Sequence, residues 1–313
     1  MPTAVIAIGG NSLIKDKDHQ SVEDQYLAAG ETDQHIAHLV AAGWDVAISH
    51  GNGPQVGFIM RRSELSRDEL HEIPMDVAGA DTQGAIGYAL QQNLVNDFRA
   101  MGIDKSVATI VTQVEVSPDD PAMINPSKPI GTFLEEAEAR KRQEDEGWVV
   151  MEDAGRGWRR MVASPQPKRI VEIDVICQLM DAGVVVICVG GGGIPVVADE
   201  KGDLYGVAAV IDKDLASALL ASEINADLLI ISTAVEKVAL RFGTPEQEWV
   251  DSFTLAEVKQ YLDDGGHFAE GSMAPKMRAV VQFLEAGGKE ALITNPENLE
   301  RALAGETGTR IVP

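Results

Sequence analysis

The sequence predicts an α/β fold, a three-layer αβα sandwich around a mainly parallel sheet. Short apolar runs rich in valine and isoleucine alternate with helical patterns along most of the chain. Largely apolar runs of that length are typical of strands covered on both faces. Because strands and helices alternate, we expect right-handed crossovers between parallel strands. A protruding subdomain is expected where the alternation breaks, at about residues 119–167.

The elements can be assigned in chain order. Five apolar runs are predicted strands: residues 5–8, 45–49, 107–111, 184–189 and 228–232. Eight segments are predicted helices: residues 23–41, 54–65, 83–99, 169–180, 215–223, 255–262, 275–284 and 296–303. Pro54 and Pro275 lie near first-turn positions, where proline is tolerated, and Gly43, Gly183 and Gly287 mark helix ends.

Residues 119–167 are polar, marked by prolines, and carry the charge run 135–146. We predict a short exposed helix there, followed by a hairpin over residues 147–162. Its strands would be residues 149–151 and 158–162, with a turn at residues 155–157. A long segment of this kind is typical of a small subdomain or lid that projects from the sheet.

Composition excludes several classes of protein. The 313 residues carry a net charge of −23, which repels nucleic acids and anionic membranes. Cys177 and Cys188 suit buried free thiols in a reducing compartment, not a disulfide scaffold or a CxxC zinc site. The N-terminus lacks the pattern of a signal peptide, and no apolar stretch approaches the ~20 residues of a membrane span. We therefore expect a soluble, cytoplasmic protein.

Three predicted strands run into glycine-rich turns, within residues 5–11, 47–54 and 186–195, and each turn is expected to lead into a helix. Without a Cβ, backbone N–H groups can approach an anion, and a helix N-terminus adds its positive dipole end. Such turns meet at the carboxyl edge of a parallel sheet. They favour a ligand that bears phosphate, although neither a P-loop nor a GxGxxG motif is present.

Lysine is scarce, with 12 in the chain, and three lysines occur in unusual settings. Lys128 lies between two prolines, Lys213 between Asp212 and Asp214, and Lys276 at an expected helix N-terminus, where a cation is unfavourable. Phosphoryl transfer needs such local cations to stabilise charge on the moving group. We expect Asp214 to orient Lys213 and Lys276 through salt bridges. The histidines show no zinc-binding spacing, and no GxSxG elbow occurs.

Eight short motifs resemble those of the amino acid kinase family, and in particular of the carbamate kinases. They occur in family order from the first strand to the last helices, so the resemblance covers nearly the whole chain. They lie at residues 8–11, 49–57, 82–88, 128–131, 164–172, 190–196, 210–216 and 271–276.

The resemblance implies a phosphotransferase that catalyses ATP + carbamate ⇌ ADP + carbamoyl phosphate by in-line transfer. Similar enzymes often run toward ATP, as the last step of arginine or purine-derived nitrogen fermentation. It also implies an acceptor-binding lobe at residues 1–207, which includes the protruding subdomain, and a nucleotide-binding lobe at residues 208–313. A homodimer is implied, as is Mg²⁺ held mainly by the nucleotide phosphates and not by a protein metal site.

The resemblance also assigns roles to single residues. Lys128 matches the subdomain lysine that reaches over the acceptor. Lys213 and Lys276 match the pair that stabilises the transition state, and Asp214 matches the carboxylate that organises them. The loops that cradle the phosphoryl group and carbamate correspond to Gly9, Gly10, Asn11, Gly51, Asn52 and Gly53. The nucleotide-binding positions correspond to Thr233, Phe242, Pro245, Ser272 and Met273.

Two positions depart from the family pattern. Asp81 stands where an apolar or thioether residue is expected. In the segment 232–236 the family usually has Asp at the middle position, whereas this chain has Ala234 there and Glu236 at the end of the segment. Neither departure removes a catalytic group. Two alternatives stay open: a related kinase for another small carboxylate, such as an acylated amino acid, and a catalytically silent nucleotide-binding regulator. A silent regulator would be expected to have lost one of the three lysines, and all three are present.

Overall fold

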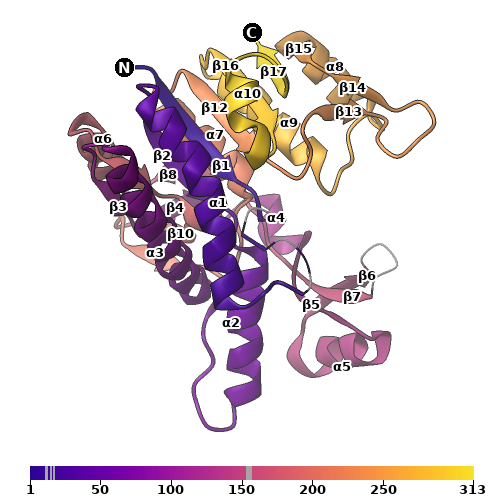
Figure 1. The fold of residues 1–313 in the computed structure, drawn as a ribbon. Helices are drawn as coiled ribbons and strands as arrows, with labels where there is room; N and C mark the ends of the chain where they lie inside the picture. Colours follow the sequence, from indigo (N-terminus) through magenta and orange to yellow (C-terminus); the bar gives the residue numbers. More distant parts are fainter. Residues whose placement is uncertain (11–12, 15, 17, 153–156) are drawn as a thin grey trace.

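An eight-stranded sheet forms the centre of the computed structural model, which describes residues 1–10, 13–14, 16, 18–152 and 157–313 (Figure 1). Neighbouring strands are parallel except for one antiparallel pair, β16 and β17. Across the sheet the strands are β15 (Ser252–Thr254), β17 (Thr309–Val312), β16 (Glu290–Thr294), β12 (Leu228–Ser232), β1 (Thr3–Ile8), β2 (Asp45–His50), β9 (Val185–Ile187) and β3 (Val107–Thr109).

Helices cover both faces of this sheet, so the predicted αβα sandwich is confirmed (Figure 1). Along β1, Ala4, Ile6 and Ile8 pack into one core, and Val5 and Ala7 pack into the other. That alternation explains why residues 4–8 of this strand are all apolar. The first core is closed by α1 (Val22–Ala41), α3 (Met75–Met101) and α10 (Leu299–Leu303). The second core is closed by α6 (Ile173–Asp181), α7 (Lys213–Glu223), α8 (Leu255–Asp264) and α9 (Met273–Glu285).

A second, four-stranded sheet was not predicted, and it corrects two sequence-based expectations. Its strands are β11 (Leu204–Gly206), β10 (Ile194–Ala198), β4 (Gln113–Val116) and β8 (Pro167–Ile170). The helix predicted over residues 169–180 begins only at Ile173, because Arg169 and Ile170 pair with β4. The third glycine turn forms a 3₁₀ turn, η2 (Gly190–Gly192), and then enters β10 instead of a helix.

The expected subdomain is present and projects from the sandwich (Figure 1). Its hairpin is β6 (Val149–Glu152) and β7 (Trp158–Val162), antiparallel as predicted, while residues 155 and 156 of the predicted turn lie outside the described residues. Strand β5 (Lys128–Leu134) and helix α5 (Glu136–Glu146) complete the subdomain. It rests on α2 (Gly53–Ser66), where a Cβ on Gly57 would come 3.3 Å from the Gly131 Cα.

Local signals explain where several helices begin and end. Ser21 caps α1 in a capping box with Asp24, and Asp212 caps α7 by accepting from the Asp214 N–H. Helix α3 starts at Met75, eight residues before the predicted start. No helix in the described part of the chain has the length and apolar character to cross a bilayer. The remaining elements are α4 (Pro121–Ile124), β13 (Val238–Leu240), β14 (Glu248–Val250) and η3 (Pro296–Asn298).

Candidate active site

The glycine turns converge on one cavity of about 420 Å³ at the carboxyl edge of the central sheet. Its walls come from the turns after β1 and β2, from η2, from the start of β5, and from the N-terminal ends of α7 and α9. This is the edge where open parallel sheets bind ligands. The predicted site residues that line the cavity are Gly9, Gly10, Gly51, Asn52, Gly53, Lys128, Lys213, Asp214, Thr233, Ser272 and Lys276.

Two glycines show why side chains are excluded here. A Cβ on Gly9 would lie 2.7 Å from the Ser232 carbonyl oxygen, so β1 and β12 could not run so close together. Gly191 has a φ of +70°, and a Cβ there would lie 2.2 Å from Asn52 Nδ2. Both positions therefore keep backbone close to the cavity.

Asp214 joins the two lysines of the cavity floor. Its Oδ1 lies 2.5 Å from Lys213 Nζ, and its Oδ2 lies 2.9 Å from Lys276 Nζ. The salt bridges expected from the sequence are therefore present. They are possible because the N-terminal ends of α7 and α9 meet there, although the two lysines are 63 residues apart in the sequence.

Burial and neighbouring charges act in opposite directions on the pKa values of Asp214 and Lys213. Burial alone would raise the pKa of Asp214, but the ammonium groups of Lys213 and Lys276 hold it below its ordinary value. Burial lowers the pKa of Lys213, and the Asp214 carboxylate works against that shift. The result is one carboxylate facing two cations, which leaves a net positive charge at the cavity floor.

Lys128 approaches the cavity from the subdomain. Its Nζ donates to Asp212 Oδ2 at 2.6 Å, and Asp212 Oδ1 meanwhile accepts from the Asp214 N–H at 2.9 Å. Asp212 thus links the subdomain lysine to the start of α7. Sequence reasoning missed this role of Asp212, because the pairing joins residues 84 positions apart.

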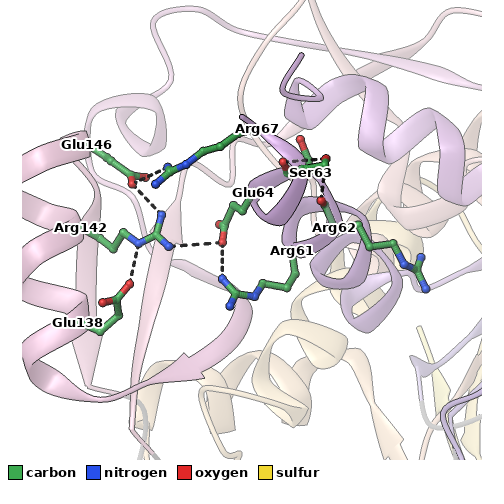
Figure 2. A network of polar contacts seen from close by, with 9 residues as sticks. Arg61, Arg62, Ser63, Glu64, Arg67, Glu138, Arg142 and Glu146 are labelled. Carbon is green, nitrogen blue, oxygen red and sulfur yellow. Dashed lines mark hydrogen bonds and ion pairs between the residues drawn. The ribbon is translucent and has the colours of Figure 1, made fainter. Parts of the chain in front are cut away.

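The subdomain that carries Lys128 is also tied to α2 by charged side chains (Figure 2). Arg142 of α5 contacts Glu64 of α2 at 3.8 Å, and Arg67, the residue after α2, contacts Glu146 of α5 at 3.2 Å. We call these four residues, together with Arg61 and Glu138, the α2–α5 ion network. Within it, Arg142 also pairs with Glu138 and Glu146, and Glu64 pairs with Arg61.

Helix α3 supports the turns from behind. Thr82 and Gln83 are fully buried; Thr82 accepts from Asn52 Nδ2, and Gln83 donates to the Gly190 carbonyl. His50 is buried beneath the same turn, and burial lowers its pKa to about 4. The neutral ring therefore donates from Nδ1 to the Gly51 carbonyl, at 3.1 Å. The sequence motif at residues 82–88 suggested no such role.

Three other predicted residues, Phe242, Pro245 and Met273, are not part of the cavity lining. Phe242 is exposed in the β13–β14 connection, where it contacts Trp249, and Pro245 lies in the same connection. Met273 is the first residue of α9 and packs against the second core. Asn11 lies outside the described residues. Of the two departures from the family pattern, Ala234 lines the cavity, whereas Asp81 is exposed on α3.

This arrangement suits a small, multiply charged anion. Three ammonium groups and backbone from several glycine turns face one space, and two carboxylates hold the ammonium groups in place. Cations fixed in advance stabilise charge that spreads over a transferred phosphoryl group. The cavity could thus hold a phosphoryl group between a donor and an acceptor.

Comparison with known proteins gives matches along the whole chain. The model of the amino acid kinase family matches residues 2–295. The chain is 50% identical over 311 residues to the carbamate kinase-like protein YahI of Escherichia coli, with 98% of each chain covered. It is 47% identical over 312 residues to carbamate kinase of Pyrococcus horikoshii, covering 99% of this chain and 98% of the relative. Carbamate kinase from Giardia lamblia bound to AMP-PNP has a TM-score of 0.92 at 41% identity, covering 99% of this chain and 98% of that one.

Proposed function

The chain belongs to the amino acid kinase family, and from that premise we propose that it is a carbamate kinase. The observation that carries the proposal is the cluster of Lys128, Lys213 and Lys276 around glycine turns, in a chain 47% identical to a carbamate kinase over nearly its full length. The related Giardia enzyme was solved with AMP-PNP, an analogue of ATP, which supports ATP as the nucleotide here.

We infer a direct transfer, ATP + carbamate ⇌ ADP + carbamoyl phosphate. In the direction of ATP formation, a terminal oxygen of the ADP β-phosphate attacks phosphorus, and the bond from phosphorus to the carbamoyl oxygen breaks. Carbamate leaves as an anion, so no separate proton donor is needed. Lys213 and Lys276 stabilise the charge on the moving group, and Asp214 holds both in place. Lys128, from the subdomain, covers the acceptor side.

We propose that Mg²⁺ enters as the counter-ion of the nucleotide phosphates, whose charge it neutralises. Of the described residues lining the cavity, the two carboxylates already have both oxygens engaged, by Lys213, Lys276, Lys128 and the Asp214 N–H. No group of three His, Cys, Asp or Glu in the described chain is placed to share a metal ion. On this proposal the protein would offer cations to the phosphates, and the nucleotide would offer the ligands to the metal.

We further propose that the enzyme works toward ATP in the cytoplasm, consuming carbamoyl phosphate from arginine breakdown, and that it is a homodimer. The two cysteines are free, which suits a reducing compartment. Val77, Tyr88 and Val95 are exposed at helical spacing on one face of α3, which also carries the exposed Asp81. We propose that this face contacts a second copy.

One assay tests the activity. Purified protein receives ADP, Mg²⁺ and carbamoyl phosphate, and ATP formation is followed directly. We expect turnover in the wild type and a loss of about 10²–10³-fold in kcat for Lys276→Ala, because a preorganised cation is removed. The matched control is Lys259→Ala, an exposed lysine of α8 paired with Glu285, which should leave kcat unchanged.

Other outcomes would promote the alternatives. ATP-dependent activity on an acylated amino acid, with none on carbamoyl phosphate, would assign the protein to another small-acid kinase. Binding of ADP without turnover of either substrate would favour a silent regulator. If Lys276→Ala lost activity only because it unfolded, as seen by circular dichroism, the role given to this lysine would be wrong.

A further inference from the structure

We propose that Thr82 orients the side-chain amide of Asn52 so that Asn52 Oδ1 faces the phosphoryl acceptor. The site would then prefer a phosphoryl acceptor that carries an N–H group. This inference rests on the proposed function. Carbamate and acetate have the same shape, but carbamate carries an amino group where acetate carries a methyl group. Thr82 would be a positioning residue that acts through Asn52.

The hydrogen bonds of Thr82 determine which end of the amide faces it. The Thr82 hydroxyl donates its one hydrogen to the Gly79 carbonyl, at 2.6 Å. Its oxygen can then only accept, and Asn52 Nδ2 lies 2.8 Å away. An amide oxygen in that position would meet oxygen lone pairs instead of a donor. The amide of Asn52 therefore has one favourable orientation.

That orientation leaves Asn52 Oδ1 available to a ligand. Asn52 is partly exposed and lines the cavity between Gly51 and Gly53. Although it occupies the N-cap position of α2, its side chain makes no capping hydrogen bond, and no hydrogen bond to its Oδ1 occurs among the described residues. Gly191 leaves room for the amide, because a Cβ there would overlap it.

The donor groups of the cavity do not make this distinction. The lysines and backbone N–H groups address the phosphoryl and carboxyl oxygens, which carbamoyl phosphate and acetyl phosphate share. A carboxamide oxygen, by contrast, accepts from an amino group and meets no partner on a methyl group. An acceptor left unpaired in a closed site disfavours the analogue that lacks the donor.

The test compares ATP formation from ADP with either carbamoyl phosphate or acetyl phosphate, for the wild type, Thr82→Val and Thr82→Ser. Valine keeps the shape of threonine without its hydroxyl, while serine keeps the hydroxyl. We expect the ratio of kcat/KM values, carbamoyl over acetyl phosphate, to fall about 3- to 10-fold in Thr82→Val, the range of one hydrogen bond. The fall should come mainly from a higher KM for carbamoyl phosphate, and Thr82→Ser should keep the ratio.

A merely structural role of Thr82 would give a different result. Equal losses with both substrates, or an unchanged ratio, would overturn the proposal. Asn52→Ala provides a second variant should Thr82→Val fold poorly, because no capping bond is lost; it should lower the same ratio, and a ratio that stays constant would also overturn the proposal. Failure of the proposed function is distinguishable, since the wild type itself would then form no ATP from carbamoyl phosphate.

Discussion

Asp33 is a buried carboxyl that the proposed chemistry does not use. It lies on α1 facing α3, is fully buried, and neither of its oxygens has a hydrogen-bond partner among the described residues. Burial raises its pKa well above the ordinary value, and the nearby Asp97 carboxyl raises it further. Burial also raises the pKa of Asp97, and His38 of α1 offsets part of that rise.

The sign of the shift makes Asp33 destabilising at neutral pH. A carboxyl with a higher pKa in the folded state contributes fully to stability below its unfolded pKa of about 3.9, and loses that contribution as the pH rises through the folded value. We expect Asp33→Asn to stabilise the protein by about 1–3 kcal/mol at pH 7, because asparagine needs no ionisation. Thermal unfolding at pH 4, 5.5 and 7 should show the gain shrinking toward pH 4.

The control is Asp68→Asn, which changes an exposed carboxylate just beyond α2. It should shift the melting temperature little at any pH. If Asp33→Asn instead destabilised the protein equally at every pH, Asp33 would be making a structural contact that its unpartnered oxygens do not indicate.

At the scale of single residues, the sequence indicated which lysines line the cavity better than it indicated the contacts that support them. Lys128, Lys213 and Lys276 could be singled out because lysine is scarce and their local settings are unusual. Asp212 and Thr82 could not, since each acts on a residue that only the fold brings near: 84 positions away for Lys128 and 30 for Asn52. Asp and Thr are also common at helix N-caps and in turns, so their types carry no signal of function.

At the scale of elements, the α2–α5 ion network joins the subdomain to α2 through charged side chains (Figure 2). Arg142 is its centre, with its side chain 13% exposed and three carboxylates within 4 Å. Helix α2 begins at the glycine turn of the cavity, and β5 begins at Lys128. A tie between α2 and the subdomain therefore also steadies Lys128 relative to the glycine turns of the cavity.

Arg142→Met should loosen this tie and raise the KM for carbamoyl phosphate about 2- to 10-fold, with the KM for ADP unchanged. The expected size corresponds to one partly buried, charge-assisted contact. Lys141→Ala, an exposed neighbour on α5, is the control. Steady-state kinetics with each substrate varied in turn gives the answer, and an equal rise in both KM values would show that the network does not act through the subdomain.

Prediction of elements succeeded where turn signals bound a strand and failed for a short strand with exposed charged residues. Strand β12 and the hairpin strand β7 match their predicted bounds, because each is set off by clear turn signals. Strand β8 has two exposed charged residues, Lys168 and Arg169, at its centre and resembles the start of a helix. Pairing with β4, which is distant in sequence, overrides that local pattern.

At the scale of the whole molecule, the predicted sandwich is confirmed, whereas local sequence patterns do not predict the second sheet. Its strands β4 and β10 are parallel neighbours separated by the entire subdomain and by α6 and β9. Only the completed fold brings them together. The net charge of −23, by contrast, follows directly from the composition. It is a property of the whole molecule and not of any single contact.

That charge should make stability rise with salt. A surplus of carboxylates repels itself in the compact state, and screening shortens the reach of this repulsion from about 30 Å at 0.01 M to about 3 Å at 1 M. Exposed ion pairs such as Lys289–Asp227 weaken too, but each is worth at most ~1 kcal/mol. We therefore expect the melting temperature to increase by several degrees between 10 mM and 1 M NaCl. Sorbitol at equal osmolality separates screening from general solute effects.

Salt should weaken the charge interactions in the cavity less than those on the surface. Lys213 and Asp214 are almost entirely buried, and buried pairs are screened much less than exposed ones. The kcat at saturating substrates should consequently vary less over this salt range than stability does. A melting temperature that fell steadily with NaCl would mean that attraction between surface charges outweighs their repulsion. The surplus acidic side chains would then have to be spaced so that their mutual repulsion lowers the free energy of unfolding only slightly.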